Sequence, residues 1–203
     1  MPQNAIIYIH GKGGSAAECE HFRPLFPEYD VFGLDFQTFT PWETGAEIRS
    51  AVLKLKAEYY SVILIANSIG AFCSMNADID SLIEKAYFIS PIVDMERLIT
   101  DMMAWANVTE DELKKKGIIH TSFGESLSWE YLSYVREHPI RWNAPTAILY
   151  GSRDNLTSSD TITTFTESHN AKLTVMKNVE HWFHTDEQMR FLDDWIKTAC
   201  IRE

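Results

Sequence analysis

Positive charge is scarce in this sequence of 203 residues. It has 18 lysines and arginines against 29 aspartates and glutamates, which gives a formal net charge of −11 at pH 7. Proteins that bind nucleic acid need clustered lysine and arginine side chains. The one basic run, Lys114–Lys116, follows three acidic residues, which is the order typical of a solvated helix. We therefore expect no nucleic-acid partner.

Long apolar runs and cysteines are scarce as well. The first four residues include no basic residue, and the apolar run after them stops at His10. That run is too short for a secretory signal or a membrane span. The three cysteines, Cys19, Cys73 and Cys200, are odd in number and widely spaced, so they form neither a metal motif nor a disulfide framework. These features predict a cytoplasmic protein with no membrane partner, in which the thiols are small core residues.

What the sequence does have is an alternation of short apolar runs with longer helical patterns. The six runs are Ala5–Ile9, Asp30–Phe36, Ser61–Ala66, Ala86–Ile89, Thr146–Tyr150 and Lys172–Lys177. Several are apolar throughout, as parallel strands buried on both faces are. Thr44–Tyr59 carries apolar residues on one helical face, and Thr185-x-x-Gln188 is a capping box that starts a last helix. The alternation predicts one α/β domain over residues 1–203 with a mostly parallel six-stranded sheet.

Residues 92–145 interrupt this alternation. They contain two or three helical patterns and no convincing strand: Thr109 and Gly117 mark the ends of one helix, and Ser128 starts another. The segment is either a long crossover between neighbouring strands or a helical lid over the strand ends, and its length favours the lid.

An apolar stripe runs along the first helical pattern of this insertion. Met102 and Trp105 belong to it. We expect these two side chains to line a pocket for a small or medium acyl group, because methionine makes adaptable apolar walls. The alternative is that the stripe only packs on the sheet.

A candidate nucleophile follows the third apolar run. Ala66-Asn67-Ser68-Ile69-Gly70 lies between a buried strand and a helix of small residues. This matches the nucleophile elbow G-x-S-x-G, except that alanine replaces the first glycine. Residues two before and two after the nucleophile must be small because the turn brings backbones close together, so alanine is a mild departure. The N–H of Ile69 would face the developing oxyanion. A serine that merely caps a helix is the alternative.

Candidate acids and bases follow the later runs. Asp154 comes just after the fifth run, and His181 and His184 come just after the sixth, while Asp94 after the fourth is a second candidate acid. A serine nucleophile needs a base, and the base needs an acid to orient it. The carboxyl ends of parallel strands meet at one edge of a sheet, where such sheets place their sites. We therefore predict a catalytic triad of Ser68, Asp154 and His181, and assign His184 to the start of the last helix.

With these motifs the chain resembles the α/β-hydrolase superfamily over nearly its whole length outside the insertion. The order Ser, Asp, His along the chain is the order in that superfamily. Tyr8–Ser15, with His10-Gly11-Lys12-Gly13, resembles its H-G-x-G oxyanion loop, and Ala144–Gly151 followed by Asp154 resembles the segment that leads to its acid. The superfamily usually carries further N-terminal strands that this chain lacks.

The resemblance implies a three-layer α/β-hydrolase fold with the first and third strands side by side. It also implies that Lys12, or as a second choice Gly11, supplies the second N–H of the oxyanion hole beside that of Ile69. We expect a serine esterase of the carboxylesterase type that cleaves an ester or thioester through an acyl-enzyme, with a small-molecule acyl substrate and no metal or cofactor.

Two other interpretations remain open. Gly11-x-Gly13-x-x-Ala16, with Asp35 closing the second run, also fits a dinucleotide-binding fingerprint of a Rossmann-like protein. That interpretation leaves the Ser, Asp and His of the triad as coincidences. A non-catalytic binding protein on the same fold is the other. A metal pair at His181-x-x-His184 lacks further ligands in a suitable position.

Overall fold

Six parallel strands form the sheet of the protein. The structure is a computed structural model that describes residues 3–36 and 38–201. The strands are β1 (Asn4–Ile9), β2 (Tyr29–Leu34), β3 (Ser61–Asn67), β4 (Lys85–Ile89), β7 (Thr146–Gly151) and β8 (Lys172–Met176). Every apolar run predicted to be a strand is one, and the predicted α/β fold with a parallel six-stranded sheet is confirmed.

The strand order is β2-β1-β3-β4-β7-β8, and all neighbours are parallel. The expected pairing of the first and third strands is therefore confirmed, since Asn4–Ile9 pairs with residues 61–66. The four inner strands are buried almost throughout, while β2 and β8 at the edges are partly exposed. This burial on both faces explains why the inner strands are continuously apolar.

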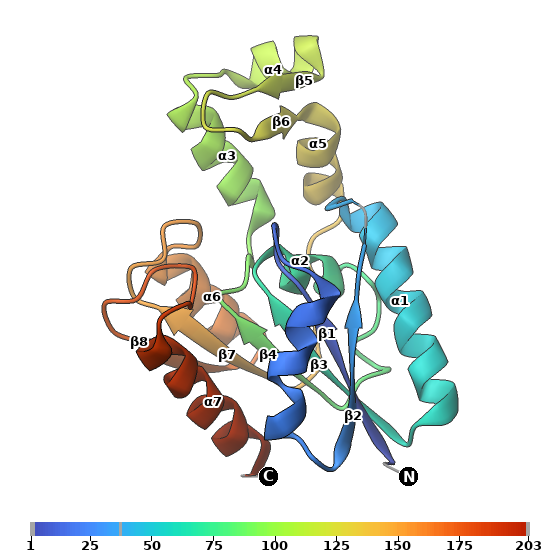
Figure 1. The fold of residues 1–203 in the computed structure, drawn as a ribbon. Helices are drawn as coiled ribbons and strands as arrows, with labels where there is room; N and C mark the ends of the chain where they lie inside the picture. The colour runs from blue at the N-terminus through green and yellow to red at the C-terminus, as the bar shows by residue number, and fades with distance from the viewer. Residues whose placement is uncertain (1–2, 37, 202–203) are drawn as a thin grey trace. The chain divides into compact units, whose positions relative to one another are not determined.

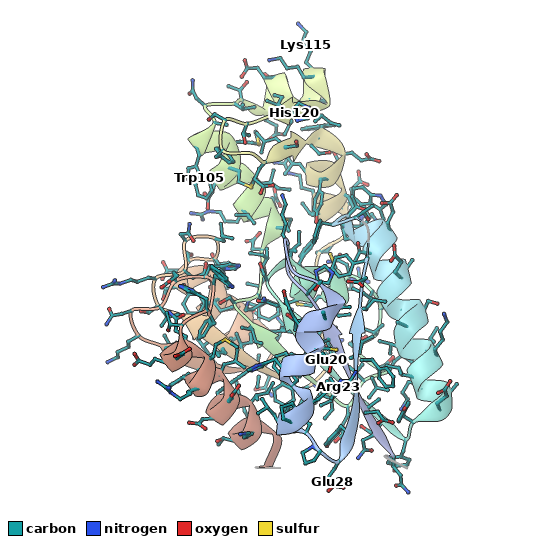
Figure 2. The ribbon with its side chains drawn as sticks, viewed as in Figure 1. Glu20, Arg23, Glu28, Trp105, Lys115 and His120 are labelled. Carbon is teal, nitrogen blue, oxygen red and sulfur yellow. The ribbon has the colours of Figure 1, made fainter. Side chains whose placement is uncertain are left out.

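Helices cover both faces of the sheet. On one face lie η1 (Ala16–His21), η2 (Arg23–Leu25) and α7 (Asp186–Ile201), seen in front of the sheet in Figure 1. Their core cluster includes Phe22 and Trp195, which lie among strand side chains such as Tyr8 and Tyr87. Glu20 and Arg23 form an ion pair of 2.7 Å on the outer side of this layer (Figure 2).

The other face is covered by α1 (Pro41–Glu58), α2 (Ile69–Met75) and α6 (Ser159–Ser168). The apolar face expected of α1 is confirmed, because Ile48 and Val52 are fully buried. The predicted capping box of α7 also forms: Gln188 N donates to Thr185 Oγ1 at 3.3 Å, and Thr185 N donates to Gln188 Oε1 at 2.9 Å. Such a box satisfies N–H groups that the first helical turn leaves without partners.

The described chain divides into two compact units. One runs to Val93 and resumes at Arg141, and the other is Asp94–Ile140. The second consists of α3 (Met95–Trp105), α4 (Glu110–Lys116), β5 (Ile118–His120), β6 (Ser126–Ser128) and α5 (Trp129–Glu137). The expectation of helices alone was wrong, since β5 and β6 pair as a small antiparallel sheet.

The helix ends predicted within this second unit are confirmed. Thr109 accepts the N–H of Glu112, Ser128 accepts the N–H of Tyr131, and Gly117 ends α4 with a φ of 75°. Inside the unit, the Arg136 guanidinium bonds carboxylates of α3 and α4. The unit is thus a small structure with its own contacts, and its action as a lid stays a prediction.

Cys19 and Cys73 are both buried core residues, as predicted. Burial raises the pKa of the Cys73 thiol to about 12. The side chain of Cys200 lies outside the described residues. Within the described part of the chain, no helix is long and apolar enough to cross a membrane.

Candidate active site

The turn at Ser68 has the strained geometry of a nucleophile elbow. Ser68 joins β3 to α2 with a φ of 53° and a ψ of −119°, a backbone conformation that costs a serine about 1–3 kcal/mol. Its N–H donates to Ile89 O at 3.0 Å, which ties the turn to β4. A Cβ on Gly70 would lie 2.5 Å from His10 O. The glycine is therefore required for α2 to approach β1, as the motif predicts.

The predicted triad residues form a continuous hydrogen-bonded chain. Ser68 Oγ lies 2.7 Å from His181 Nε2, and His181 Nδ1 lies 2.7 Å from Asp154 Oδ2. If Nδ1–H donates to the carboxylate, Nε2 is left as the acceptor for the Ser68 proton. The structure thus brings together three side chains from the ends of three different strands.

Asp154 is held from both sides. Its side chain is fully buried, whereas that of His181 is 16% exposed. Oδ1 accepts the N–H groups of Leu156 at 2.8 Å and Thr157 at 3.0 Å, which leaves Oδ2 for the imidazole. Burial, followed by the charge of Asp154, raises the pKa of the neighbouring Tyr150 to about 12, so this phenol stays neutral and donates to Thr157 O at 2.9 Å.

The loops that carry the acid and the base are joined by backbone contacts. Arg153 N donates to Val179 O at 2.7 Å, and Asn178 N donates to Ser152 Oγ at 2.8 Å. A Cβ on Gly151 would lie 2.5 Å from the carbonyl oxygens of Val179 and Glu180. The need for a glycine at position 151 was not predicted from the sequence, although its place three residues before the acid was a signal.

His184 and Asp94 have other partners. His184 Nδ1 lies 2.9 Å from Trp182 O, and its ring stacks on the Trp182 indole with 4.4 Å between centroids. His184 N also donates to Gln188 at the start of α7, as expected. Asp94 is the N-cap of α3, where it accepts the N–H of Arg97. The geometry therefore favours His181 as base and Asp154 as acid.

The H-G-K-G segment forms a tight turn against Ser68. Gly14 N donates to Gly11 O at 3.1 Å, and Gly13 has a φ of 80°, which only glycine adopts without strain. A Cβ on Gly11 would lie 3.2 Å from Ser68 Cβ, so the turn approaches the elbow closely. Lys12 is the residue between the two glycines. The oxyanion role of the Lys12 N–H stays a prediction.

His10 packs against this turn. It is 4% exposed, its ring stacks on Phe36 at 4.1 Å, and Nδ1 lies 2.7 Å from Gly11 O. The ring thereby supports the start of the loop without taking part in the triad.

Two observations count against the dinucleotide-binding interpretation. Rossmann sheets have the order 3-2-1-4-5-6, whereas β1 here lies between β2 and β3. Asp35 Oδ1 accepts the N–H of Ala16 at 2.7 Å, so the carboxylate that would bind a ribose caps η1 instead. Among the described residues, no group of three or more His, Cys, Asp or Glu side chains could hold a metal ion.

Met102 and Trp105, the predicted pocket residues, both lie on α3. Met102 is partly buried. Trp105, labelled in Figure 2, is 55% exposed. Its ring meets that of Phe123 edge to face, with 6.2 Å between centroids. Their part in a substrate pocket stays a prediction.

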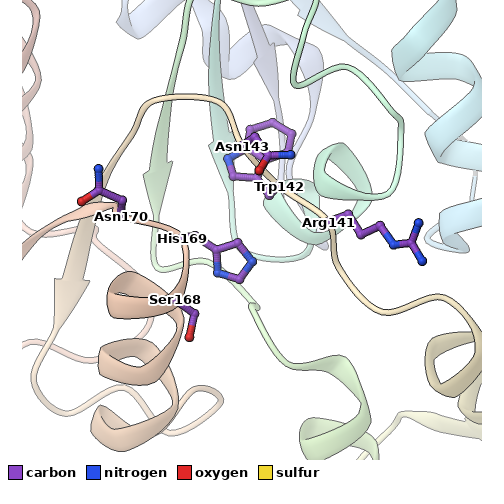
Figure 3. Close-up of a pocket in the computed structure, with 6 residues that line it drawn as sticks. All are labelled: Arg141, Trp142, Asn143, Ser168, His169 and Asn170. Atoms are coloured by element: carbon purple, nitrogen blue, oxygen red, sulfur yellow. The ribbon is translucent and has the colours of Figure 1, made fainter.

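A cavity of about 550 Å³ lies at the end of the sheet opposite the triad, next to the amino ends of β7 and β8. It is lined by Arg141, Trp142, Asn143, Ser168, His169 and Asn170, shown in Figure 3. These residues precede β7 and β8, so the cavity is at the amino ends of the strands, whereas the triad is at their carboxyl ends. The cavity is therefore separate from the candidate active site.

No protein-family model and no curated protein matches the sequence, but solved structures share its fold. Est1E from Butyrivibrio proteoclasticus, in a structure with ferulic acid bound, has a TM-score of 0.77 and 16% identity, over 99% of this chain and 92% of that one. Alpha/beta hydrolase domain-containing protein 10 from mouse has a TM-score of 0.69 and 15% identity, over 97% of this chain and 89% of that one. XC6422 from Xanthomonas campestris is named an α/β serine hydrolase without lid. It has a TM-score of 0.68 and 14% identity, over 100% of this chain and 83% of that one. The chain therefore has the α/β-hydrolase fold.

Proposed function

We propose that the protein is a serine hydrolase of the carboxylesterase type, which cleaves an ester or thioester through an acyl-enzyme. Ser68 Oγ attacks the carbonyl carbon while His181 Nε2 takes its proton. The N–H groups of Ile69 and Lys12 hold the oxyanion, and Asp154 stabilises the imidazolium. His181 then protonates the departing alcohol or thiol. Water, activated by the same imidazole, releases the acid and restores Ser68.

The observation that carries the proposal is the hydrogen-bonded chain from Ser68 Oγ to His181 to Asp154, with 2.7 Å at each step. The strain at Ser68 adds to it. A binding protein gains nothing from a serine at a φ of 53°, whereas a nucleophile must project from the turn. These two features favour catalysis over a non-catalytic role for the fold.

For the substrate we propose a small or medium acyl group, bound in a pocket to which Met102 and Trp105 contribute from residues 94–140. The structure of Est1E holds ferulic acid. That ligand makes aromatic acyl esters a sensible addition to a panel of straight-chain esters. We expect kcat/KM on p-nitrophenyl esters to peak at roughly two to six acyl carbons, and Met102→Trp to slow the longer members of the series most.

The test is labelling by a fluorophosphonate, which reacts with activated serines, together with turnover on that panel. Wild type should be labelled, while Ser68→Ala should not and should lose several orders of magnitude in kcat. Ser74→Ala is the matched control, because Ser74 lies on α2, is fully buried, and its hydroxyl donates to Gly70 O at 2.7 Å within the same helix. Equal labelling of wild type and Ser68→Ala would rule out this nucleophile.

A further inference from the structure

Two polar side chains, Tyr8 and Glu18, meet next to the H-G-K-G turn, and the proposed mechanism does not use them. Tyr8 is on β1, Glu18 is on η1, and Asn67 ends β3 directly before the nucleophile. Tyr8 is 3% exposed and packs in the core with its ring 5.3 Å from that of Phe22. A phenylalanine would fill this apolar site equally well, so the hydroxyl group needs an explanation of its own.

The Tyr8 hydroxyl bonds the Glu18 side chain. It donates to Glu18 Oε2 at 2.5 Å. Burial, reinforced by Glu18, raises the pKa of Tyr8 above the usual value for a tyrosine. The phenol therefore remains a neutral donor to the carboxylate throughout the pH range in which an esterase works.

Asn67 and Glu18 lie near the two ends of the turn, and Glu18 bonds its backbone. At the start, Asn67 Nδ2 lies 3.6 Å from the point where a Cβ on Gly11 would be. At the end, Glu18 Oε1 accepts the N–H of Ser15 at 3.3 Å. A Cβ on Gly14 would lie only 2.5 Å from Glu18 Oε1, so the carboxylate lies directly against the turn.

We infer that Tyr8 and Glu18 are positioning residues that fix the turn Gly11–Ser15 relative to Ser68, and so place the oxyanion-binding N–H of Lys12. The inference rests on the proposed function, because it assigns these residues a part in the same reaction. They do not touch the substrate. Their effect passes through the backbone of the turn, where Glu18 accepts the N–H of Ser15.

The expected effect follows from the contribution of one oxyanion donor to catalysis. Removal of one such donor lowers kcat about 10²- to 10³-fold. Loss of the Tyr8 hydroxyl leaves the donor present but less well placed, so we expect Tyr8→Phe to lower kcat about tenfold or more. KM should change little, because the donor acts mainly on charge that develops in the transition state.

The experiment compares Tyr8→Phe and Glu18→Ala with Tyr87→Phe as the matched control. Tyr87 is a buried tyrosine of the same core cluster, but its hydroxyl donates to Ala199 O in α7, away from the turn. Both test variants should lower kcat on p-nitrophenyl butyrate with KM unchanged, and the double variant should cost little more than one alone. Glu18→Gln, which keeps an acceptor oxygen, should recover much of the loss. Tyr87→Phe should keep the wild-type kcat.

A second measurement does not depend on activity. Amide exchange of Gly14, whose N–H closes the turn on Gly11 O, should be faster in Tyr8→Phe than in Tyr87→Phe. If Tyr8→Phe keeps kcat within about twofold and Gly14 exchange at the wild-type rate, the positioning role is refuted while the triad stands. If wild type is neither labelled at Ser68 nor active on esters, the proposed function fails, and Gly14 exchange alone decides whether the network holds the turn.

Discussion

His181 and His184 lie three residues apart, yet their ring nitrogens have different partners. His181 bridges Ser68 and Asp154, whereas His184 is stacked on Trp182 near the start of α7. His181→Ala should therefore abolish ester turnover, while His184→Ala should leave most of it. Steady-state kinetics on one p-nitrophenyl ester, with circular dichroism to confirm folding, checks this. The opposite pattern would assign the base role to His184.

The orientation of His181 depends on the carboxylate of Asp154. In Asp154→Asn the amide oxygen can still accept the N–H groups of Leu156 and Thr157, which turns the NH₂ group toward Nδ1. That arrangement imposes the wrong tautomer, so kcat should fall by roughly 10⁴. Asp94→Asn is the control and should cost little, because Asp94 caps α3 and asparagine is also a good N-cap. A severe loss in the control alone would mean that the acid follows β4.

Residue-level prediction from the sequence works where strand ends bring residues together. Ser68, Asp154 and His181 follow three apolar runs, and the geometry of a parallel sheet places such positions at one edge. The contact of Tyr8 with Glu18 has no such pattern. It depends on the path of η1 back over β1, which nothing in the periodicity of residues 8–18 specifies.

At the level of elements, the close packing of α2 on β1 rests on Gly70. In Gly70→Ala the new Cβ would collide with the carbonyl oxygens of Ile9 and His10, and backbone cannot move as a flexible side chain can. We expect a loss of about 1–3 kcal/mol in the free energy of unfolding and a larger loss of activity, because α2 begins next to Ser68. Urea unfolding and kcat measure the two effects.

The control for this change is Gly45→Ala in α1. Its Cβ would come no closer than 3.2 Å to Asn76 O, and alanine favours a helix over glycine by about 1 kcal/mol. The two contributions oppose each other, so stability should change little and activity should be unchanged. Similar losses in both variants would show that the approach of α2 to β1 is not specially tight.

Elements with strong periodicity were predictable and short ones were not. The six strands of the sheet are predicted by their apolar runs, and the start of α7 is predicted by the capping box Thr185-x-x-Gln188. β5 and β6 have three residues each, too few for an alternating pattern. β5 begins one residue after α4, and β6 ends directly before α5. Gly124, with a φ of 87° between them, was the one local sign of a hairpin.

For the whole molecule, buried phenols set a limit on stability at high pH. The folded-state pKa of Tyr150 is raised from 10.0 to about 12. The stability that this shift contributes is fully present below pH 10 and is lost as the pH rises through 12, because the unfolded chain ionises first. The urea midpoint should therefore fall between about pH 10 and pH 12, and fall less steeply in Tyr150→Phe.

The control for the pH series is Tyr60→Phe, since the Tyr60 side chain is 86% exposed. It should follow the wild-type curve at every pH. Parallel curves for Tyr150→Phe and wild type would show that Tyr150 does not contribute to the alkaline loss of stability.

The three triad residues follow β3, β7 and β8, which are separated along the chain by the whole insertion and by α6. Correct spacing of their side chains exists only when β4 has paired with β3 and β7, and β8 has been added at the edge. We therefore predict that a nascent chain on the ribosome, with its sheet partly built, is inactive on esters until His181 has emerged. On dilution from denaturant, the return of activity should therefore report the pairing of the edge strand β8, the last step of assembly. It should occur later than the return of secondary structure in the inner strands.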